Sequence, residues 1–272
     1  MRVAIFAAPY DTGRRDHRMG RGPGRLLERG VDARFRARGH HVTTEWLEVP
    51  ESPAGDVRHA FDLYAELATR VHAAAAFPLV LAGNCGVTLG AVAGLGWEGT
   101  GVVWFDAHGD FNTPDTSPSG YLDGMTLAAL TGRCWRAMAA RIPGFAPLPE
   151  TQAVLVGARD LDPPEARALA DSGVRRVATD LAGLDAALVP PIQRAYLHVD
   201  LDVLDPSEGR ANQFAAAGGL TVSVLQDAIR RVAARVPIAG AAMTAYDPAQ
   251  DPDGRIATAA LAVGDAIAAA LA

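Results

Sequence analysis

The chain has 272 residues, of which 49% are hydrophobic and 21% charged, and its formal net charge is −6 at pH 7. A nucleic-acid groove requires clustered Lys and Arg, so this acidic balance argues against a nucleic-acid partner. The first apolar run ends at Pro9 and Asp11, too early for a signal peptide, and Pro, Gly or Asp interrupts the longer apolar stretches. We therefore expect no membrane partner and a cytoplasmic location, where Cys85 and Cys134 stay reduced.

Eight apolar or β-branched runs alternate with helix-like segments along the chain. Buried parallel strands read as continuous apolar sequence, so this alternation predicts a parallel sheet with helices on both faces. Neither a low-complexity linker nor an internal repeat is present, and one domain over residues 1–272 is expected. The glycines after residue 83 predict a turn. The predicted strands are 3–8, 41–47, 78–83, 101–107, 152–158, 174–179, 194–202 and 238–247, and the predicted helices are 22–38, 56–76, 164–172 and 221–236.

Four of these strands end in side chains that can bind metal or carry out catalysis. In open parallel sheets, ligands bind beyond the carboxyl ends of the strands. We therefore expect these side chains to share one rim of the sheet. They are Asn84, Cys85, Asp106, His108, Asp110, Asp200, Asp202 and Asp247.

Acids that converge on one rim would repel one another unless a bound cation offsets their charge. Asp106, His108 and Asp110 alternate, so an extended backbone would place them on one face, and Asp200 and Asp202 repeat this spacing. Each motif alone also fits a polar surface loop, but both follow apolar strands in the same chain. Oxygen ligands with a single imidazole favour Mn²⁺ over structural zinc, and carboxylates in this number typically bridge two metals.

Six motifs follow one another along the chain: GPGRLL (22–27), DAHGDFNTP (106–114), SPSG (117–120), VGARDLDPPE (156–165), HVDLDVLDPS (198–207) and GGLT (218–221). In this order they resemble the ureohydrolase family of arginase, agmatinase and formiminoglutamase. The resemblance implies a three-layer α/β/α fold with an eight-stranded parallel sheet and a site for two Mn²⁺ ions at the strand ends. It also implies hydrolysis of a C–N bond in a linear guanidino or amidine substrate, with release of urea or a relative.

The resemblance also implies a set of metal ligands. Asp106 and Asp200 match carboxylates that bridge both metals. Asp110 matches a ligand of the first metal that also passes a proton to the leaving amine, which is general acid catalysis. His108 and Asp202 match ligands of the second metal.

Cys85 stands where the family has a histidine ligand of the first metal. A thiolate is softer than an imidazole and would favour Zn²⁺ or Fe²⁺ over Mn²⁺ at that position. The alternative is a buried thiol that binds no metal. This cysteine and the run at 120–125 also resemble one branch of the family, the Nω-hydroxy-L-arginine amidinohydrolase of D-cycloserine biosynthesis.

The substrate positions of the family are partly kept. Asn112, Ser117 and Ser119 match residues that contact the carboxylate of an amino-acid substrate, directly or through water. Asp162 matches a residue near the substrate's amino group. These matches predict a small guanidino compound with an amino-acid end as the substrate.

The positions around the guanidino group depart from the family. Tyr121 replaces an asparagine, and Asp123 replaces a histidine that shuttles protons. Ala245 replaces the glutamate that pairs with guanidinium, and a methyl group cannot pair with a cation. In an active hydrolase of a modified guanidine, Asp123 or Asp247 is expected to take over recognition of the cation.

Three readings of the function stay open. The first is a hydrolase of a modified guanidine such as Nω-hydroxy-L-arginine, which would release hydroxyurea. The second is an arginase or agmatinase of ordinary specificity. The third is a metal-binding member that has lost catalysis. A homo-oligomer is a further expectation, because the family is often trimeric or hexameric.

Overall fold

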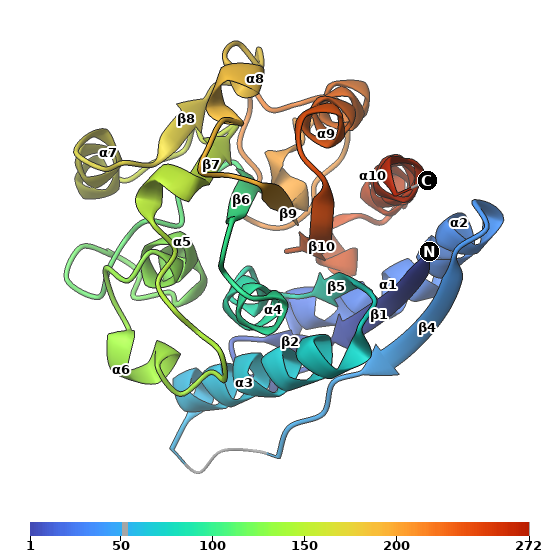
Figure 1. Cartoon of the computed structure of the whole chain (residues 1–272), viewed down its shortest axis with the longest axis horizontal. Helices are drawn as coiled ribbons and strands as arrows, with labels where there is room; N and C mark the ends of the chain where they lie inside the picture. Colours follow the sequence, from blue (N-terminus) through green and yellow to red (C-terminus); the bar gives the residue numbers. More distant parts are fainter. Residues whose placement is uncertain (51–53, 272) are drawn as a thin grey trace.

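The computed structural model of the chain describes residues 1–50 and 54–271. Its centre is a sheet of eight parallel strands in the order β4-β1-β5-β10-β9-β6-β7-β8 (Figure 1), which confirms the predicted sheet. A separate antiparallel pair is formed by β2 (Tyr10–Asp11) and β3 (Arg14–Arg15). The strands of the large sheet are β1 Arg2–Ala8, β4 His41–Trp46, β5 Phe77–Ala82, β6 Thr100–Phe105, β7 Ala153–Val156, β8 Arg175–Val177, β9 Arg194–Asp200 and β10 Ile238–Thr244.

Helices cover both faces of this sheet, which gives three layers (Figure 1). The helices on one face are α1 Gly22–Glu28, α2 Val31–Ala37, α8 Leu184–Ala187, α9 Val222–Arg235 and α10 Arg255–Ala270. Those on the other face are α3 Asp56–Ala74, α4 Val87–Leu95, α5 Thr126–Leu130, α6 Arg136–Ala139 and α7 Pro163–Ala170.

Alternation along each central strand divides the core into two halves. On β6, Val103 and Phe105 belong to the hydrophobic cluster under α9, whereas Val102 and Trp104 belong to the cluster under α4. Successive side chains of a strand point to opposite faces, so a strand covered on both sides must be apolar throughout. This is why the predicted strands read as continuous apolar runs.

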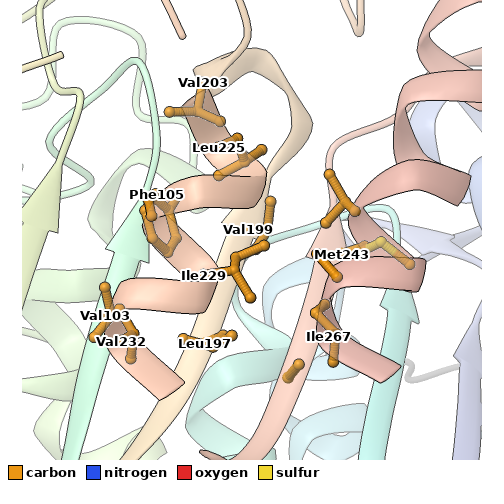
Figure 2. Close-up of a cluster of buried hydrophobic side chains, with 14 of the residues drawn as sticks. Val103, Phe105, Leu197, Val199, Val203, Leu225, Ile229, Val232, Met243 and Ile267 are labelled. Atoms are coloured by element: carbon orange, nitrogen blue, oxygen red, sulfur yellow. The ribbon is translucent and has the colours of Figure 1, made fainter. Parts of the chain in front are cut away.

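Helix α9 illustrates how the covering helices are fixed to the sheet. Figure 2 shows its Leu225, Ile229 and Val232 facing the side chains of β6 and β9. Their spacing of four and then three residues keeps them on one face of the helix. Burial of each such side chain contributes about 1.5–3 kcal/mol. The hydroxyl of Thr221 accepts the backbone N–H of Val224 at 3.3 Å and caps the start of the helix.

The expected turn is present at residues 83–86, but the glycines that follow it lie in a helix, because α4 begins at Val87. The glycines in this segment serve helix packing. A Cβ at Gly90 would clash with the carbonyl oxygen of Tyr64 on α3, and one at Gly94 would lie 2.5 Å from the carbonyl oxygen of Ala68. Glycine lets the backbones of α3 and α4 approach closely, a requirement that is invisible in a single sequence.

Two further differences concern helices. The single helix predicted over 22–38 is divided into α1 and α2 by Gly30, whose φ of +85° no α-helix allows. The apolar C-terminal segment forms α10, and within residues 1–50 and 54–271 no helix is long and apolar enough to cross a membrane. The expectation of one domain over residues 1–272 stays a prediction, and residues 51–53 and 272 lie outside the described part.

Candidate active site

The candidate site lies beyond the carboxyl ends of four adjacent strands, β5, β10, β9 and β6, in the middle of the sheet. Cys85 follows β5, Ala245 follows β10, Asp200 ends β9 and Asp106 follows β6. All four strands run parallel, so their ends meet on the same rim. Residues separated by up to 160 positions in the chain are therefore brought together by strand order.

Two groups of potential metal ligands converge there. Ligand atoms of Cys85, Asp106, His198 and Asp200 all lie within 4.8 Å of one another, and so do those of Asp106, His108 and Asp202. Asp106 belongs to both groups, which is the arrangement that a residue between two ions would have. The structure thus brings together five of the six residues expected to bind metal. The sixth, Asp110, lies outside both groups but lines the adjoining cavity.

The electrostatics of this cluster favour a bound cation. Burial and then the charge of Asp202 raise the pKa values of Asp106 and Asp200. Burial and then the charge of Asp106 raise the pKa of Asp110 well above its ordinary value. The buried Oδ2 of Asp110 has no hydrogen-bond partner among the described residues. Cations between these oxygens would offset the repulsion and satisfy that atom, so the donor set fits divalent metal ions.

The rings of Trp104 and His198 pack against each other and contact the potential metal ligands. Trp104 donates its Nε1–H to Oδ2 of Asp106 at 2.9 Å and stacks on the ring of His198 with 3.7 Å between the ring centroids. The Nδ1 of His198 lies 2.8 Å from the hydroxyl of Thr88. Burial lowers the pKa of His198 to about 3, so its ring stays neutral. His198 and Asp200 are two positions apart on β9, so their side chains point to the same face of the sheet. This spacing was the signal in the sequence that could have identified His198.

A cavity of about 250 Å³ opens above the cluster. Every residue expected to contact the substrate lines it except Asp247. The carboxylate of Asp247 instead accepts the backbone N–H of Ala249 at 3.0 Å and lies 3.8 Å from Arg21. The predicted residues that line the cavity are Asn112, Ser117, Ser119, Tyr121, Asp123 and Asp162.

Asp123 is a buried acid that lines this cavity. Burial is the largest of the effects that raise its pKa to about 7. Asn84 donates its side-chain N–H to Oδ2 at 2.8 Å, and the backbone N–H of Gly86 donates to Oδ1 at 3.2 Å. Both bonds stabilise the charged form and therefore limit the rise of the pKa that burial causes.

Six residues that line the cavity were not predicted as site residues: Met19, Gly124, Asp160, Glu165, Asn212 and Phe214. Asn212 is buried and donates its side-chain N–H to Oδ2 of Asp202 at 3.1 Å and to the carbonyl oxygen of Ala245 at 2.9 Å. Ala245 also lines the cavity. Asn212 and Phe214 stand in the long connection between β9 and α9 and belong to no motif, so only tertiary structure reveals them.

Comparisons with known proteins show the family and the fold of the chain. Residues 1–270 match the family described as the arginase family. An arginase of Bacillus caldovelox is 30% identical over an alignment of 288 positions that covers 96% of each chain. The crystal structure of arginase from Bacillus cereus matches 98% of each chain with a TM-score of 0.89 and 26% identity. Proclavaminate amidino hydrolase from Streptomyces clavuligerus shares the fold at 21% identity, with a TM-score of 0.71 over 99% of this chain and 91% of that one. The chain therefore belongs to the arginase family and is a hydrolase of that family.

Proposed function

We propose that this arginase-family hydrolase cleaves a C–N bond in a linear guanidino or amidine substrate with the help of two divalent metal ions. The observation that carries the proposal is the pair of ligand groups that share Asp106 beyond the central strands. The unpartnered Oδ2 of Asp110 beside them supports it. Water and substrate would meet in the cavity directly above these groups.

The metal ligands follow from position and chemistry. Cys85, Asp106, Asp110 and Asp200 would hold one ion, and Asp106, His108, Asp200 and Asp202 would hold the other. Mn²⁺ is the first candidate because oxygen ligands predominate, and the thiol of Cys85 allows Zn²⁺ or Fe²⁺. Ions bound there would activate water at neutral pH and stabilise the negative charge of the transition state.

The protein's own carboxyl groups would handle the protons of the reaction. Hydrolysis breaks the C–N bond, and the departing nitrogen requires a proton. Asp110 would pass to it the proton released by water, because its unpartnered Oδ2 adjoins the cluster and the residue lines the cavity. Asp123, with a pKa of about 7, would act as a second proton carrier in the same cavity.

The substrate we propose is Nω-hydroxy-L-arginine or a similar modified guanidine. Asn112, Ser117, Ser119 and Asp162 line the cavity and would bind the amino-acid end. The guanidino end would meet Ala245, which cannot form an ion pair, so the carboxylate of Asp123 would take that role. The curated relatives named arginase favour a second candidate, unmodified arginine, because one of them aligns over 96% of this chain.

Product release distinguishes these candidates. The purified protein is given Mn²⁺, Zn²⁺ or Fe²⁺ in turn and incubated with arginine, agmatine and Nω-hydroxy-L-arginine, and urea and hydroxyurea are quantified. We expect the highest kcat/KM with Nω-hydroxy-L-arginine, and we expect Ala245→Glu to shift the ratio of kcat/KM values toward arginine. If the protein binds two ions but converts none of the three compounds, the proposal of catalysis fails. A higher kcat/KM for arginine than for its hydroxylated form would support the second candidate.

A further inference from the structure

Asp11 is a buried carboxylate that the proposed chemistry does not use. It ends the short strand β2, and its side chain is completely buried. Its Oδ2 accepts Nε–H of Arg18 at 2.7 Å, and the side chain of Arg18 is 36% exposed. A buried charge with a cationic partner of this kind needs further hydrogen bonds to be retained.

The other oxygen of Asp11 makes these bonds toward the cavity. Oδ1 accepts the hydroxyl of Tyr121 at 3.0 Å and a side-chain N–H of Asn84 at 3.5 Å. The hydroxyl of Thr12 also donates to it at 3.2 Å. Asp11 and Tyr121 are 110 residues apart, so this contact is purely tertiary.

Both partners of Asp11 lead to residues that line the cavity. The amide of Asn84 donates to Asp123 at 2.8 Å and lies 3.1 Å from the hydroxyl of Tyr121. Tyr121 itself lines the cavity, where its ring lies 5.8 Å from the ring of Phe214. The guanidinium of Arg18 also lies 5.8 Å from the centre of the Tyr121 ring, so the ion pair contacts both the hydroxyl and the face of this side chain.

The backbone of residues 10–13 packs closely against the residues that follow β5. A Cβ at Gly83 would clash with the carbonyl oxygen of Tyr10, and its neighbour Asn84 accepts the backbone N–H of Thr12. Thr12 and Gly13 have positive φ values of 46° and 78°, which reverse the chain immediately after Asp11. The segment 10–13 is therefore packed directly on the end of β5, next to the residue that contacts Asp123.

We propose that Asp11 is a positioning residue, which with Arg18 holds the Tyr121 ring and the Asn84 amide in place and thereby shapes the substrate cavity beside Asp123. The consequence for substrate affinity rests on the proposed function. The contact itself does not, because it can be observed without turnover. Asp11 acts through Tyr121 and Asn84 and touches no substrate.

The test combines kinetics with a measurement on Tyr121. In Asp11→Ala, KM for the preferred substrate is expected to rise about tenfold, while kcat changes less than about threefold and the number of bound Mn²⁺ ions is unchanged. Asp11→Asn retains an acceptor oxygen and should show a smaller rise. In combination with Tyr121→Phe, the loss should be less than additive, because both changes remove the same hydrogen bond.

Glu150→Ala is the matched control, since Glu150 also accepts an arginine Nε–H, from Arg133 at 2.6 Å, and does not line the cavity. NMR of protein with ring-labelled tyrosine resolves five residues, and Tyr121→Phe identifies the relevant signal. Asp11→Ala should shift this signal, whereas Glu150→Ala should not. An unchanged Tyr121 signal, or a fall in thermal stability with unchanged KM and additive losses, would overturn the proposal. If no substrate is converted, the NMR comparison still decides the role of Asp11.

Discussion

Cys85 is the only thiol among the potential metal ligands of the described residues. Its Sγ lies 3.1 Å from Oδ2 of Asp200, within the group that shares Asp106. Burial, followed by the charges of Asp123 and Asp200, raises the pKa of the thiol well above its ordinary value. A bound cation would reverse this effect and stabilise the thiolate, which is why the residue can serve as a ligand despite its acidic surroundings.

We predict that Cys85→Ser weakens Zn²⁺ binding at least about tenfold and Mn²⁺ binding by less. A thiolate is a soft ligand that suits Zn²⁺, whereas the hydroxyl oxygen suits harder ions. Isothermal titration with each metal measures the difference. Cys134→Ser is the control, because Cys134 belongs to neither group of potential ligands. Its thiol lies 3.8 Å from the backbone oxygen of Met125. Equal Zn²⁺ affinities for the unaltered protein and Cys85→Ser would show that the thiol is not a ligand.

Glu150 provides a prediction about pH at a position away from the site. The hydrogen bond from Arg133 lowers its pKa below the ordinary value of 4.5. An acid whose pKa is lowered in the folded state stabilises the fold above its unfolded pKa, and this contribution is lost as the pH falls through the folded pKa. Glu150→Gln should therefore reduce the free energy of unfolding at pH 7 by about 0.5–1 kcal/mol.

The reduction caused by Glu150→Gln should decline once the pH falls below 4.5. Urea unfolding at neutral and acidic pH measures it. Glu28→Gln serves as the comparison, since the carboxylate of Glu28 is 70% exposed and lies 3.3 Å from Arg25. If Glu150→Gln lowers the free energy of unfolding by the same amount at neutral and acidic pH, the ion pair with Arg133 is not the cause of that loss.

At the scale of elements, Arg159 fixes the connection between β9 and α9 to the rest of the rim. Its guanidinium donates to backbone carbonyl oxygens of Gly157, Asp202, Ala216 and Ala217 at 2.8 to 3.1 Å. This connection carries Asn212 and Phe214, which line the cavity. One side chain after β7 thus holds the loop that completes the cavity wall.

We predict that Arg159→Lys lowers the free energy of unfolding by about 2 kcal/mol, since several hydrogen bonds worth about 0.5–1.5 kcal/mol each are lost. Lysine cannot reproduce the planar arrangement of five donors. Hydrogen exchange of residues 205–219 should become faster. Arg175→Lys is a control, because Arg175 bonds to the carbonyl oxygens of Ala187 and Val189 at another edge. If hydrogen exchange of residues 205–219 is as slow in Arg159→Lys as in the unaltered protein, Arg159 does not have this role.

At the scale of the whole molecule, metal binding should be coupled to stability, because the ligands come from strands that are distant in sequence. The unfolded chain has no such cluster. An ion that binds only the folded state at 100 times its Kd adds about 2.7 kcal/mol. For a domain of this size, that corresponds to a rise of about 5 °C in Tm.

We predict this rise on addition of Mn²⁺, measured by differential scanning calorimetry, and its reversal by a chelator. Asp106→Ala should abolish it, because Asp106 belongs to both ligand groups. Asp115→Ala, a change at an exposed acid of the same loop, should preserve it. A Tm that does not respond to Mn²⁺, Zn²⁺ or Fe²⁺ would remove the basis of the proposed chemistry. The oligomeric state stays a prediction, and calorimetry at two protein concentrations addresses it as well.

The sequence alone determined the eight parallel strands and the residues at their ends. Continuous apolar runs indicate burial on both faces of a sheet, and acids that directly follow such runs indicate a ligand site at its rim. Cys85, Asp106, His108, Asp200 and Asp202 could therefore be predicted and are brought together by the structure.

Only the tertiary structure decided the surroundings of that cluster. Strand order places β10 between β5 and β9, and close packing makes glycines part of α4 where the sequence suggested a turn. Asp11 and Asn212 carry no motif, and Asp247 proved to lie outside the cavity. Local patterns record whether a side chain is buried, but its partners depend on contacts between distant segments, which no local pattern encodes.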